Sequence, residues 1–282
     1  MSAPTLPTDL LPSPPAGTPE FAIVFDNVHI AFEENEILRG VSFRLAFGET
    51  KALFGVAGSG KSTILKLALG LLQPDSGSIT VLGNDVTRMR EREMLPVRSH
   101  LGMVFQESAL FDSLTVRENV AFRLIEEKGL YDDETDQRVR EALRFVELEH
   151  TVDLFPSELS GGMRRRVAIA RAIITHPELL LYDSPTAGLD PVTSNTIVEL
   201  IVKQRDVSKA SSLLVTHRLQ DAFTMATHEF DTGNNQLRAL PRGQYCNVPM
   251  SFLILRDGKV IFDGDVHQLA RTRDEYIREY IS

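Results

Sequence analysis

Hydrophobic positions along the chain first alternate with a period of two and then follow helical spacing. Val41, Phe43 and Leu45 stand at alternate positions, which predicts a strand with one buried face. The early strands predicted from such runs cover 21–32, 37–47 and 51–55. Over 61–72 the apolar residues recur at helical spacing, so a strand leads through a glycine-rich loop into a helix. That order indicates the beginning of an α/β unit.

Three later runs are apolar at nearly every position, as expected of central parallel strands that are covered on both faces. They cover 101–105, 179–182 and 212–215. Residues 116–144 have a Glu- and Arg-rich helical pattern and predict a helical subdomain inserted into the sheet protein. Near the carboxyl end, Asp257-Gly258 predicts a type I′ turn in a hairpin over 252–262, and a last helix is expected over 265–280.

The composition is that of a globular protein, with 282 residues, 43% hydrophobic and 24% charged. The net charge of −9 disfavours broad binding to nucleic acid, which is therefore not an expected partner. The single cysteine, Cys246, excludes an internal disulfide and fits a reducing compartment. No apolar run approaches the roughly 18 residues that span a bilayer, so work at a membrane is expected from its surface or through a partner. Six prolines fall within 1–19, and residues 1–20 are expected to be a disordered tail.

Residues 55–62 match the phosphate-binding pattern G-x-x-x-x-G-K-[ST] and stand between a predicted strand and a predicted helix. Glycines let backbone N–H groups turn toward a phosphate, and the helix N-terminus adds partial positive charge. Lys61 is expected to bridge the β- and γ-phosphates, and the Ser62 hydroxyl is expected to ligate Mg²⁺. The alternative is a flexible glycine turn, which has no need of a Lys-Ser pair at the helix start. The nucleotide-binding residues predicted in this loop are Gly55, Val56, Ala57, Gly58, Ser59, Gly60, Lys61, Ser62 and Thr63.

Further segments follow in the order and spacing of the ATP-binding-cassette (ABC) ATPases, which the chain resembles over nearly all of 21–282. They are Gln106 of Val104-Phe105-Gln106 (the Q-loop), Leu159-Ser160-Gly161-Gly162-Met163 (the signature motif), Leu179-Leu180-Leu181-Tyr182-Asp183 (the Walker B strand), Ala187-Gly188-Leu189-Asp190 (the D-loop) and His217 of Val215-Thr216-His217 (the switch histidine). The resemblance implies an α/β fold of the P-loop NTPase class with a RecA-like core. It also implies an N-terminal antiparallel β-subdomain, an inserted helical subdomain at about 107–176, and ATP and Mg²⁺ as cofactors.

The resemblance implies roles for single residues as well. ATP would lie between the phosphate loop of one subunit and Ser160, Gly161 and Gly162 of another, in a head-to-tail homodimer or a pair with a related ABC ATPase. Asp190 would belong to the same composite site. The expected metal ligands are Ser62, Gln106 and Asp183, and the expected catalytic residues are Lys61, Gln106, Asp183 and His217, whose imidazole can both donate and accept.

Two further features have alternative interpretations. Phe32 stands where this family usually has an aromatic residue that stacks on adenine, but it could equally be a core residue of a strand. Arg164, Arg165 and Arg166 begin the helix after the signature motif. They are either a basic phosphate patch or, as is commoner for adjacent arginines, a solvated helix face.

Ser184 departs from the family pattern, which has glutamate directly after the Walker B aspartate. A hydroxyl has no accessible conjugate base at neutral pH, so hydrolysis is expected to be slower. Three interpretations stay open. His217 with Gln106 positions the water in a slow ATPase, or the chain is a degenerate half that pairs with a glutamate-bearing partner or simply closes on ATP. In the third, serine was introduced into an otherwise normal enzyme to trap nucleotide.

Residues 105–122 resemble the ATPases of bacterial lipid-transport systems of the Mla/Mce type, although importers of amino acids share much of the neighbouring signature segment. In that family this stretch faces a transmembrane permease, and Leu110 and Phe111 are candidate anchors unless they pack under the helical subdomain. The expected function is the energy-coupling subunit of a transporter, located in the cytoplasm on the inner face of the membrane. A soluble ATP-gated clamp and a non-hydrolysing regulatory module are the alternatives. An unusual loop at 228–250 is a candidate dock for an accessory regulator.

Overall fold

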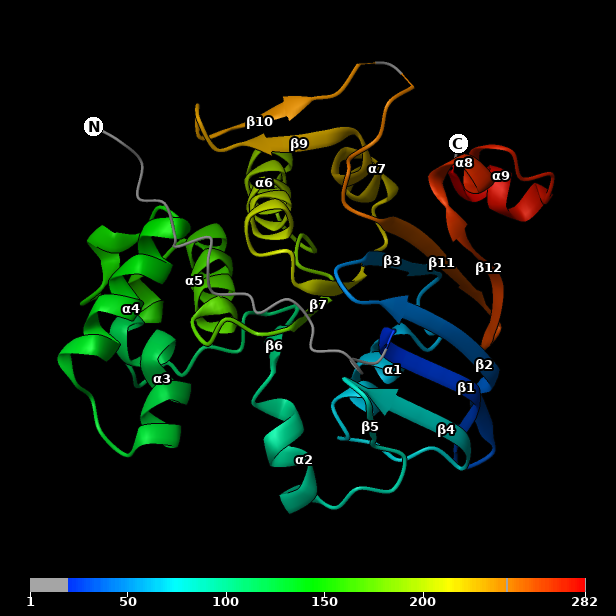
Figure 1. Ribbon diagram of the computed structural model, residues 1–282, viewed down its shortest axis with the longest axis horizontal. Helices are drawn as coiled ribbons and strands as arrows, with labels where there is room; N and C mark the ends of the chain where they lie inside the picture. Colours follow the sequence, from blue (N-terminus) through cyan, green and yellow to red (C-terminus); the bar gives the residue numbers. More distant parts are fainter. Residues whose placement is uncertain (1–19, 242, 282) are drawn as a thin grey trace.

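A six-stranded sheet forms the centre of the protein in a computed structural model that describes residues 20–241 and 243–281 (Figure 1). The expected tail at 1–20 lies outside the described residues except for Glu20. The strand order is β12-β11-β3-β8-β7-β6, and every neighbouring pair from β11 to β6 is parallel. The central strands are β3 (Thr50–Gly55), β6 (Leu101–Val104), β7 (Leu179–Asp183) and β8 (Ser211–Val215). Every residue of β3 and β8 is buried, as expected of parallel strands covered on both faces.

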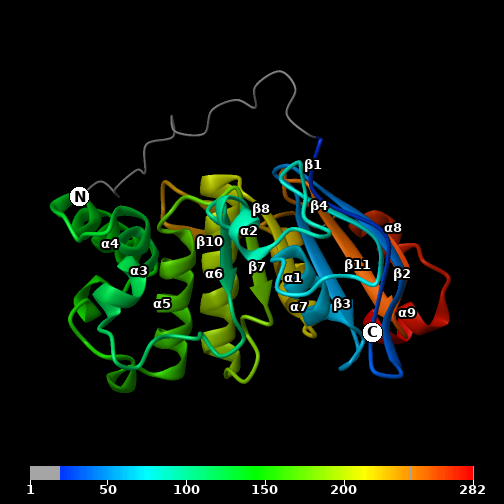
Figure 2. The ribbon, with the colours of Figure 1, turned by 90° about the horizontal axis from the view of Figure 1, so that it is seen from below.

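A second, antiparallel sheet has the order β2-β1-β4-β5. Its strands are β1 (Phe21–Phe32), β2 (Asn35–Ala46), β4 (Ser76–Val81) and β5 (Asn84–Asp85). Val41, Phe43 and Leu45 are buried and alternate with exposed neighbours, so the predicted half-buried strand is confirmed. The Phe43 ring stacks on Phe25 of the neighbouring strand at a centroid distance of 4.7 Å. Helix α1 (Lys61–Ala68) contributes its apolar face to the core that the two sheets share (Figure 2).

The helices on the other face of the central sheet form a second core. The helical subdomain contains α3 (Val116–Lys128), α4 (Asp133–Phe145) and α5 (Gly161–Ile173), which lie together at the left of Figure 1. Short 3₁₀ turns occur at Glu149–Thr151 and Pro156–Glu158. Three further helices are α2 (Glu91–Arg98), α6 (Pro191–Ser208) and α7 (Leu219–Thr227). None of the helices described is both long enough and apolar enough to cross a membrane.

The carboxyl-terminal part confirms one expectation and corrects another. Strands β11 (Met250–Arg256) and β12 (Lys259–Asp265) form the predicted hairpin, with positive φ at both Asp257 and Gly258 as a type I′ turn requires. The single helix expected over 265–280 is wrong, because two helices are present, α8 (Val266–Ala270) and α9 (Glu275–Ile281). Asp274 separates them, since its carboxylate accepts a hydrogen bond from the N–H of Ile277 and begins a new helix.

Residues 228–250, expected as an irregular loop, contain a hairpin of β9 (His228–Asp231) and β10 (Gln236–Ala239). The Gly and Asn residues between the strands make one tight turn, in which the Asp231 carboxylate accepts from the N–H groups of Gly233 and Asn234. Phe230 and Leu237 pack against the core of the helical side. The hairpin is thus an integral part of the fold.

Asn119 of α3 fixes the segment that leads from β6 into the helical subdomain. Its side chain is fully buried, and its Oδ1 accepts from the N–H of Phe111 at 2.8 Å. Its Nδ2 donates to the carbonyls of Phe111, Leu114 and Thr115, each at 3.0 Å. One side chain therefore contacts four backbone groups of a loop that has no regular structure of its own, with one of the two N–H groups of Nδ2 shared between two carbonyls.

We expect Asn119→Ala to lower the free energy of unfolding by about 2–4 kcal/mol, because partly buried backbone groups would lose their partners and a buried side chain would be truncated. Urea denaturation followed by circular dichroism measures the change. Asn84→Ala is the matched control, since Asn84 is exposed and also bonds to local carbonyls. Its loss should stay below about 1 kcal/mol. Equal losses in the two variants would contradict a special role for Asn119.

Candidate functional site

The polar residues singled out from the sequence gather at one edge of the central sheet. Strands β3, β8, β7 and β6 are neighbours and parallel, so their carboxyl ends meet at the same edge. In register, Leu53 pairs with Val215, and Val215 pairs with Asp183. Gln106 follows β6 by two residues and is exposed, and His217 follows β8 by two residues and is also exposed. The structure thus brings the loops that carry Lys61, Gln106, Asp183 and His217 to one edge.

The loop between β3 and α1 has the conformation of an anion cradle. Gly60 begins α1 with φ of 98°, and a Cβ atom there would lie 2.5 Å from the Leu38 side chain, so only glycine fits. No described side chain caps this helix end, which leaves its first N–H groups free for a ligand. At Gly58, by contrast, a Cβ atom would meet no other atom within 4 Å, so the space beside this glycine is open. This geometry fits a phosphate group.

Lys61 lies within the cradle. Its Nζ donates to the carbonyls of Gly55 and Val56, both at 2.8 Å, and its charge faces Asp183. Burial lowers the pKa of Lys61, and the Asp183 carboxylate opposes that shift. The loop therefore holds a cation beside the first helical turn, where it would meet the terminal phosphates of a nucleotide.

Ser62 and Asp183 offer two oxygen ligands for a divalent cation. The Ser62 Oγ lies 3.4 Å from Asp183 Oδ1, and the Ser184 Oγ lies 3.5 Å from the same oxygen. The described residues hold no cluster of three or more His, Cys, Asp or Glu side chains suited to a metal. A site with few protein ligands suits Mg²⁺, which keeps several waters and takes the rest of its shell from substrate phosphates. The donor set therefore fits Mg²⁺ held jointly with a nucleotide.

Ser184 lies between the Asp183 carboxylate and the end of β8. Its backbone has φ of 47°, its side chain is nearly buried, and its N–H donates to Val215 at 2.9 Å. This bond places residue 184 beside the turn that carries His217. The Thr186 hydroxyl two residues later donates to Asp221 of α7 at 2.5 Å, and Arg218 lies 3.5 Å from the same carboxylate.

Asp221 itself is buried beneath this turn. Burial raises its pKa, while the hydrogen bond from Thr186 and the charge of Arg218 oppose the rise. Arg218 also donates to the Ser194 hydroxyl of α6 at 2.5 Å. The loops after β7 and β8 are therefore tied to each other and to α6 by side chains that the sequence analysis did not single out. Little in the sequence indicates these contacts, because each is made by a common polar residue near a helix start.

The signature segment and the Asp190 segment are packed against each other. Ser160 caps α5 by accepting from the N–H of Met163 at 3.2 Å, and Asp190 caps α6 by accepting from Val192 and Thr193 at 3.0 Å. A Cβ atom at Gly162 would lie 2.4 Å from Cγ2 of Thr193, so the two helix starts approach too closely for any side chain there. These features lie on α5 and α6, whereas the phosphate loop lies on β3 and α1.

The solvated-face interpretation of Arg164, Arg165 and Arg166 is wrong. Arg165 is only 6% exposed and donates to the carbonyls of Phe105 at 3.0 Å and Ala187 at 3.3 Å. Arg164 donates to the Leu159 carbonyl at 2.8 Å and Arg166 to the Val146 carbonyl at 3.1 Å. Helical spacing indicates that Arg165 is buried. Ala168 and Ala172, three and seven residues later, lie on the same face of α5 and are buried.

Of the apolar candidates, Phe32 and Phe111 are exposed and Leu110 packs against the core. Phe32 is 46% exposed at the end of β1, so the core-residue interpretation is wrong and its ring is available to a ligand. Leu110 packs against the core of the helical side, whereas Phe111 is 44% exposed and its ring lies 4.7 Å from that of Phe122. Phe111 and Phe122 thus form an apolar surface pair beside the Q-loop segment.

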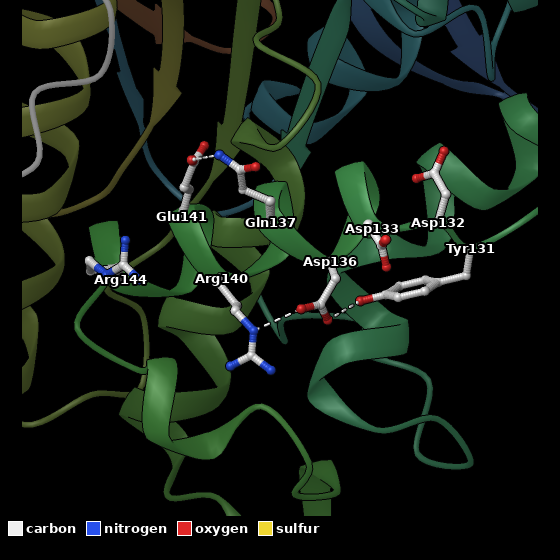
Figure 3. Close-up of a pocket in the computed structure, with 8 residues that line it drawn as sticks. All are labelled: Tyr131, Asp132, Asp133, Asp136, Gln137, Arg140, Glu141 and Arg144. Carbon is white, nitrogen blue, oxygen red and sulfur yellow. Dashed lines mark hydrogen bonds and ion pairs between the residues drawn. The ribbon is translucent and has the colours of Figure 1, made fainter.

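A surface pocket of about 490 Å³ lies apart from the strand ends, along α4 (Figure 3). Its polar groups bond to each other: Asp136 accepts from Tyr131 at 2.7 Å and from Arg140 at 2.8 Å, and Gln137 donates to Glu141 at 2.9 Å. Figure 3 shows these side chains paired along the helix. None of the residues predicted to be functional lines this pocket.

Comparison with known proteins adds independent findings. Residues 38–187 match the family model described as ABC transporter. The chloroplastic protein TRIGALACTOSYLDIACYLGLYCEROL 3 of Arabidopsis thaliana is 36% identical over 262 residues, which cover 90% of this chain and 71% of that protein. The intermembrane phospholipid transport system ATP-binding protein MlaF of Haemophilus influenzae is 31% identical, covering 92% of this chain and 84% of that protein.

The chain is also similar to a methionine importer subunit and to a solved cassette structure. The methionine import ATP-binding protein MetN of Geobacillus kaustophilus is 42% identical, over 64% of this chain and 52% of that protein. Among solved structures, a dimeric ATP-binding cassette bound to ADP and phosphate superposes with a TM-score of 0.71 at 28% identity, covering 86% of this chain and 98% of that one. The predicted fold class, a P-loop NTPase with an antiparallel β-subdomain and inserted helices, is confirmed.

We expect Gly162→Ala to lower the free energy of unfolding by about 1–3 kcal/mol, because the new methyl group would collide with Thr193. Thr193 cannot turn away freely, since its hydroxyl donates to Asp190 at 2.5 Å. Gly161→Ala is the matched control: its Cβ would find its nearest neighbours at 4.0 Å, so its stability should be equal or higher. Thermal unfolding of both variants measures the difference, and a loss in Gly161→Ala alone would contradict the packing argument.

Proposed function

Because the chain belongs to the ABC transporter ATPase family, we propose that it uses its strand-edge site to bind and hydrolyse ATP and thereby drives lipid transport by a separate membrane permease. The observation that carries the proposal is the convergence of the phosphate cradle, the Ser62–Asp183 oxygen pair, Gln106 and His217 on one sheet edge. A nucleotide with its metal needs this combination of backbone donors, one cation and few oxygen ligands.

Each site residue has a stated role in this proposal. The backbone of the phosphate loop, Lys61 and Thr63 hold the phosphates, and Phe32 stacks on adenine with its exposed ring. Ser62, Gln106 and Asp183 hold Mg²⁺, which when bound neutralises phosphate charge. His217 donates to the γ-phosphate from the turn beside Ser184. Lys61 brings positive charge to the transferring phosphoryl group.

A second copy of the chain, or a related ABC ATPase, completes the site. Ser160, Gly161 and Gly162 stand at the start of α5 and offer a second helix end to an anion, and Asp190 lies against them through Thr193. These groups lie on elements other than those of the phosphate loop, which suits contact with the nucleotide of a second subunit. The dimeric cassette with ADP and phosphate supports such a pairing.

The lipid cargo is supported by the two relatives whose names mention phospholipid transport or a galactolipid. The similarity to a methionine importer supports only the transporter role.

The Phe111–Phe122 pair is the proposed contact with the permease, because exposed aromatic pairs suit a protein partner. In this arrangement the chain lies on the cytoplasmic side of the membrane. The β9–β10 hairpin is the proposed contact for an accessory regulator.

A second candidate function rests on Ser184. With a hydroxyl where the general base is expected, the chain either hydrolyses ATP slowly or acts as a closing half beside a competent partner. Asp183 is the carboxylate in contact with Ser184, and it is committed to the metal. The backbone at residue 184 is held in place, because its N–H donates to the carbonyl of Val215 at the end of β8.

We expect Ser184→Glu to raise steady-state phosphate release at least about tenfold, since a general base commonly contributes about 10²–10⁴-fold. A coupled phosphate assay with Mg²⁺ and saturating ATP measures the rate. Ser184→Gln is the matched control. Glutamine has the size of glutamate but cannot act as a base, so the rate of phosphate release should not increase. A wild-type rate that neither substitution changes would show that residue 184 does not limit hydrolysis.

We expect Phe111→Ser to reduce recovery of the membrane permease with this chain from detergent-solubilised membranes at least about fivefold, because the exposed half of an aromatic anchor would be lost. Nucleotide affinity should not change. Leu95→Ser, which removes an exposed apolar residue of α2, is the matched control and should leave recovery unchanged. Failure of the wild-type chain to recover any membrane protein would contradict the transporter role itself.

A further inference from the structure

Two arginines of α5 hold the loop that carries Gln106 from both sides. Arg165 donates through Nη1 to the carbonyl of Phe105, directly before Gln106. Arg171 donates through Nη2 to the carbonyl of Ser108 and through Nη1 to the carbonyl of Ala109, both at 2.7 Å. The side chain of Gln106 is exposed, but the backbone on either side of it is fixed to one helix.

The loop needs this support because its conformation is costly. Ser108 and Ala109 both have positive φ, 68° and 47°, a region that side chains other than glycine seldom adopt. The two hydrogen bonds from Arg171 come from a charged donor, and such bonds are stronger than neutral ones. The guanidinium group therefore stabilises a backbone shape that the loop sequence alone disfavours.

Arg165 makes a second contact that reaches another part of the site. Its Nη2 donates to the carbonyl of Ala187, which leads into the segment ending at Asp190. One nearly buried guanidinium group thus joins the start of the Gln106 loop to the start of the Asp190 segment. The helix that carries Arg165 is capped by Ser160, only five residues earlier.

These contacts connect residues that serve different nucleotides. In the proposed dimer, Gln106 faces the nucleotide held by its own chain, whereas Ser160 and Asp190 face the nucleotide held by the partner. We propose that Arg165 is a positioning residue that couples the two nucleotide sites of the dimer, by linking the Gln106 loop rigidly to α5 and to the Asp190 segment. This inference rests on the proposed function.

The coupling has a simple physical basis. A nucleotide that positions the Gln106 loop at one site also positions, through the Arg165 contacts, the start of α5 and the Asp190 segment, so the second site forms at lower cost. Arg171 contributes by holding the far end of the Gln106 loop, but its described hydrogen bonds do not reach the Asp190 segment. Its effect should therefore be smaller than that of Arg165.

The same helix provides a matched control. Arg166 is the next residue, is partly buried like Arg171, and donates only to the Val146 carbonyl of the helical subdomain among its described hydrogen bonds. Burial lowers the pKa of both Arg165 and Arg166. The two positions thus share charge and helix, and in both burial lowers the pKa, but Arg165 is the more buried and they differ in which loops they reach.

The test is ATP-driven dimerisation of the full chain, measured by sedimentation velocity over a titration of Mg-ATP. For Arg165→Gln we expect about a tenfold higher ATP concentration at half-dimerisation, about 1.4 kcal/mol, and a Hill coefficient that falls toward 1. Affinity of the monomer for ATP, measured without Mg²⁺ at low protein concentration, should change less than about twofold. Arg165→Lys, which keeps the charge and can reach one carbonyl, should give an intermediate midpoint, and Arg171→Gln a smaller shift.

Several outcomes would overturn the inference. Dimerisation of Arg165→Gln at the wild-type ATP concentration would do so, as would an equal shift in Arg166→Gln. A wild-type chain that binds ATP without dimerising has no second site to couple, which also overturns it while leaving the nucleotide site intact. If neither Arg165 variant folds, the role of Arg165 is structural and the inference is wrong. A wild-type chain that does not bind Mg-ATP would instead overturn the proposed function.

Discussion

A parallel sheet covered on both faces leaves only the ends of its strands for polar chemistry. In this protein β3 and β8 are buried at every residue, and β7 is buried up to Asp183. The charged and hydroxyl groups therefore collect where the strands end, and because the strands are parallel neighbours, those ends coincide. The phosphate cradle, the Ser62–Asp183 pair and the turns carrying Ser184 and His217 all depend on this constraint.

The helical side of the molecule adds a second layer to the site. Helix α5 packs its apolar face into the core beside β6 and β7, and its arginines reach outward to backbone carbonyls of the surrounding loops. Such bonds satisfy backbone carbonyls that lie outside the strands and helices. Asn119 does the same for the segment around Phe111. The irregular loops of the site are thus held by hydrogen bonds from side chains of neighbouring helices.

Residue 184 lies where the turns after β7 and β8 meet. The turn after β7 has positive φ and a fixed N–H, and it sits between the Asp183 carboxylate and the His217 turn. A hydroxyl there cannot take up a proton as a carboxylate can. Phosphoryl transfer depends mainly on positioning and electrostatics, and the phosphate cradle, Lys61 and the Ser62–Asp183 pair are in place without a contribution from the Ser184 side chain.

Sequence alone determined the local features: the strand-loop-helix unit with Lys61, the alternating strand around Phe43 and the type I′ turn at Asp257 and Gly258. These follow from short-range rules, because periodicity, glycine spacing and turn preference act within a few residues. Tertiary structure alone decided the contacts of Arg165, whose carbonyl partner Phe105 is 60 positions away, and the hairpin at 228–239. A long side chain such as arginine pairs with whatever unsatisfied carbonyl the fold brings near, so its role depends on the packing of several elements at once and leaves no local pattern.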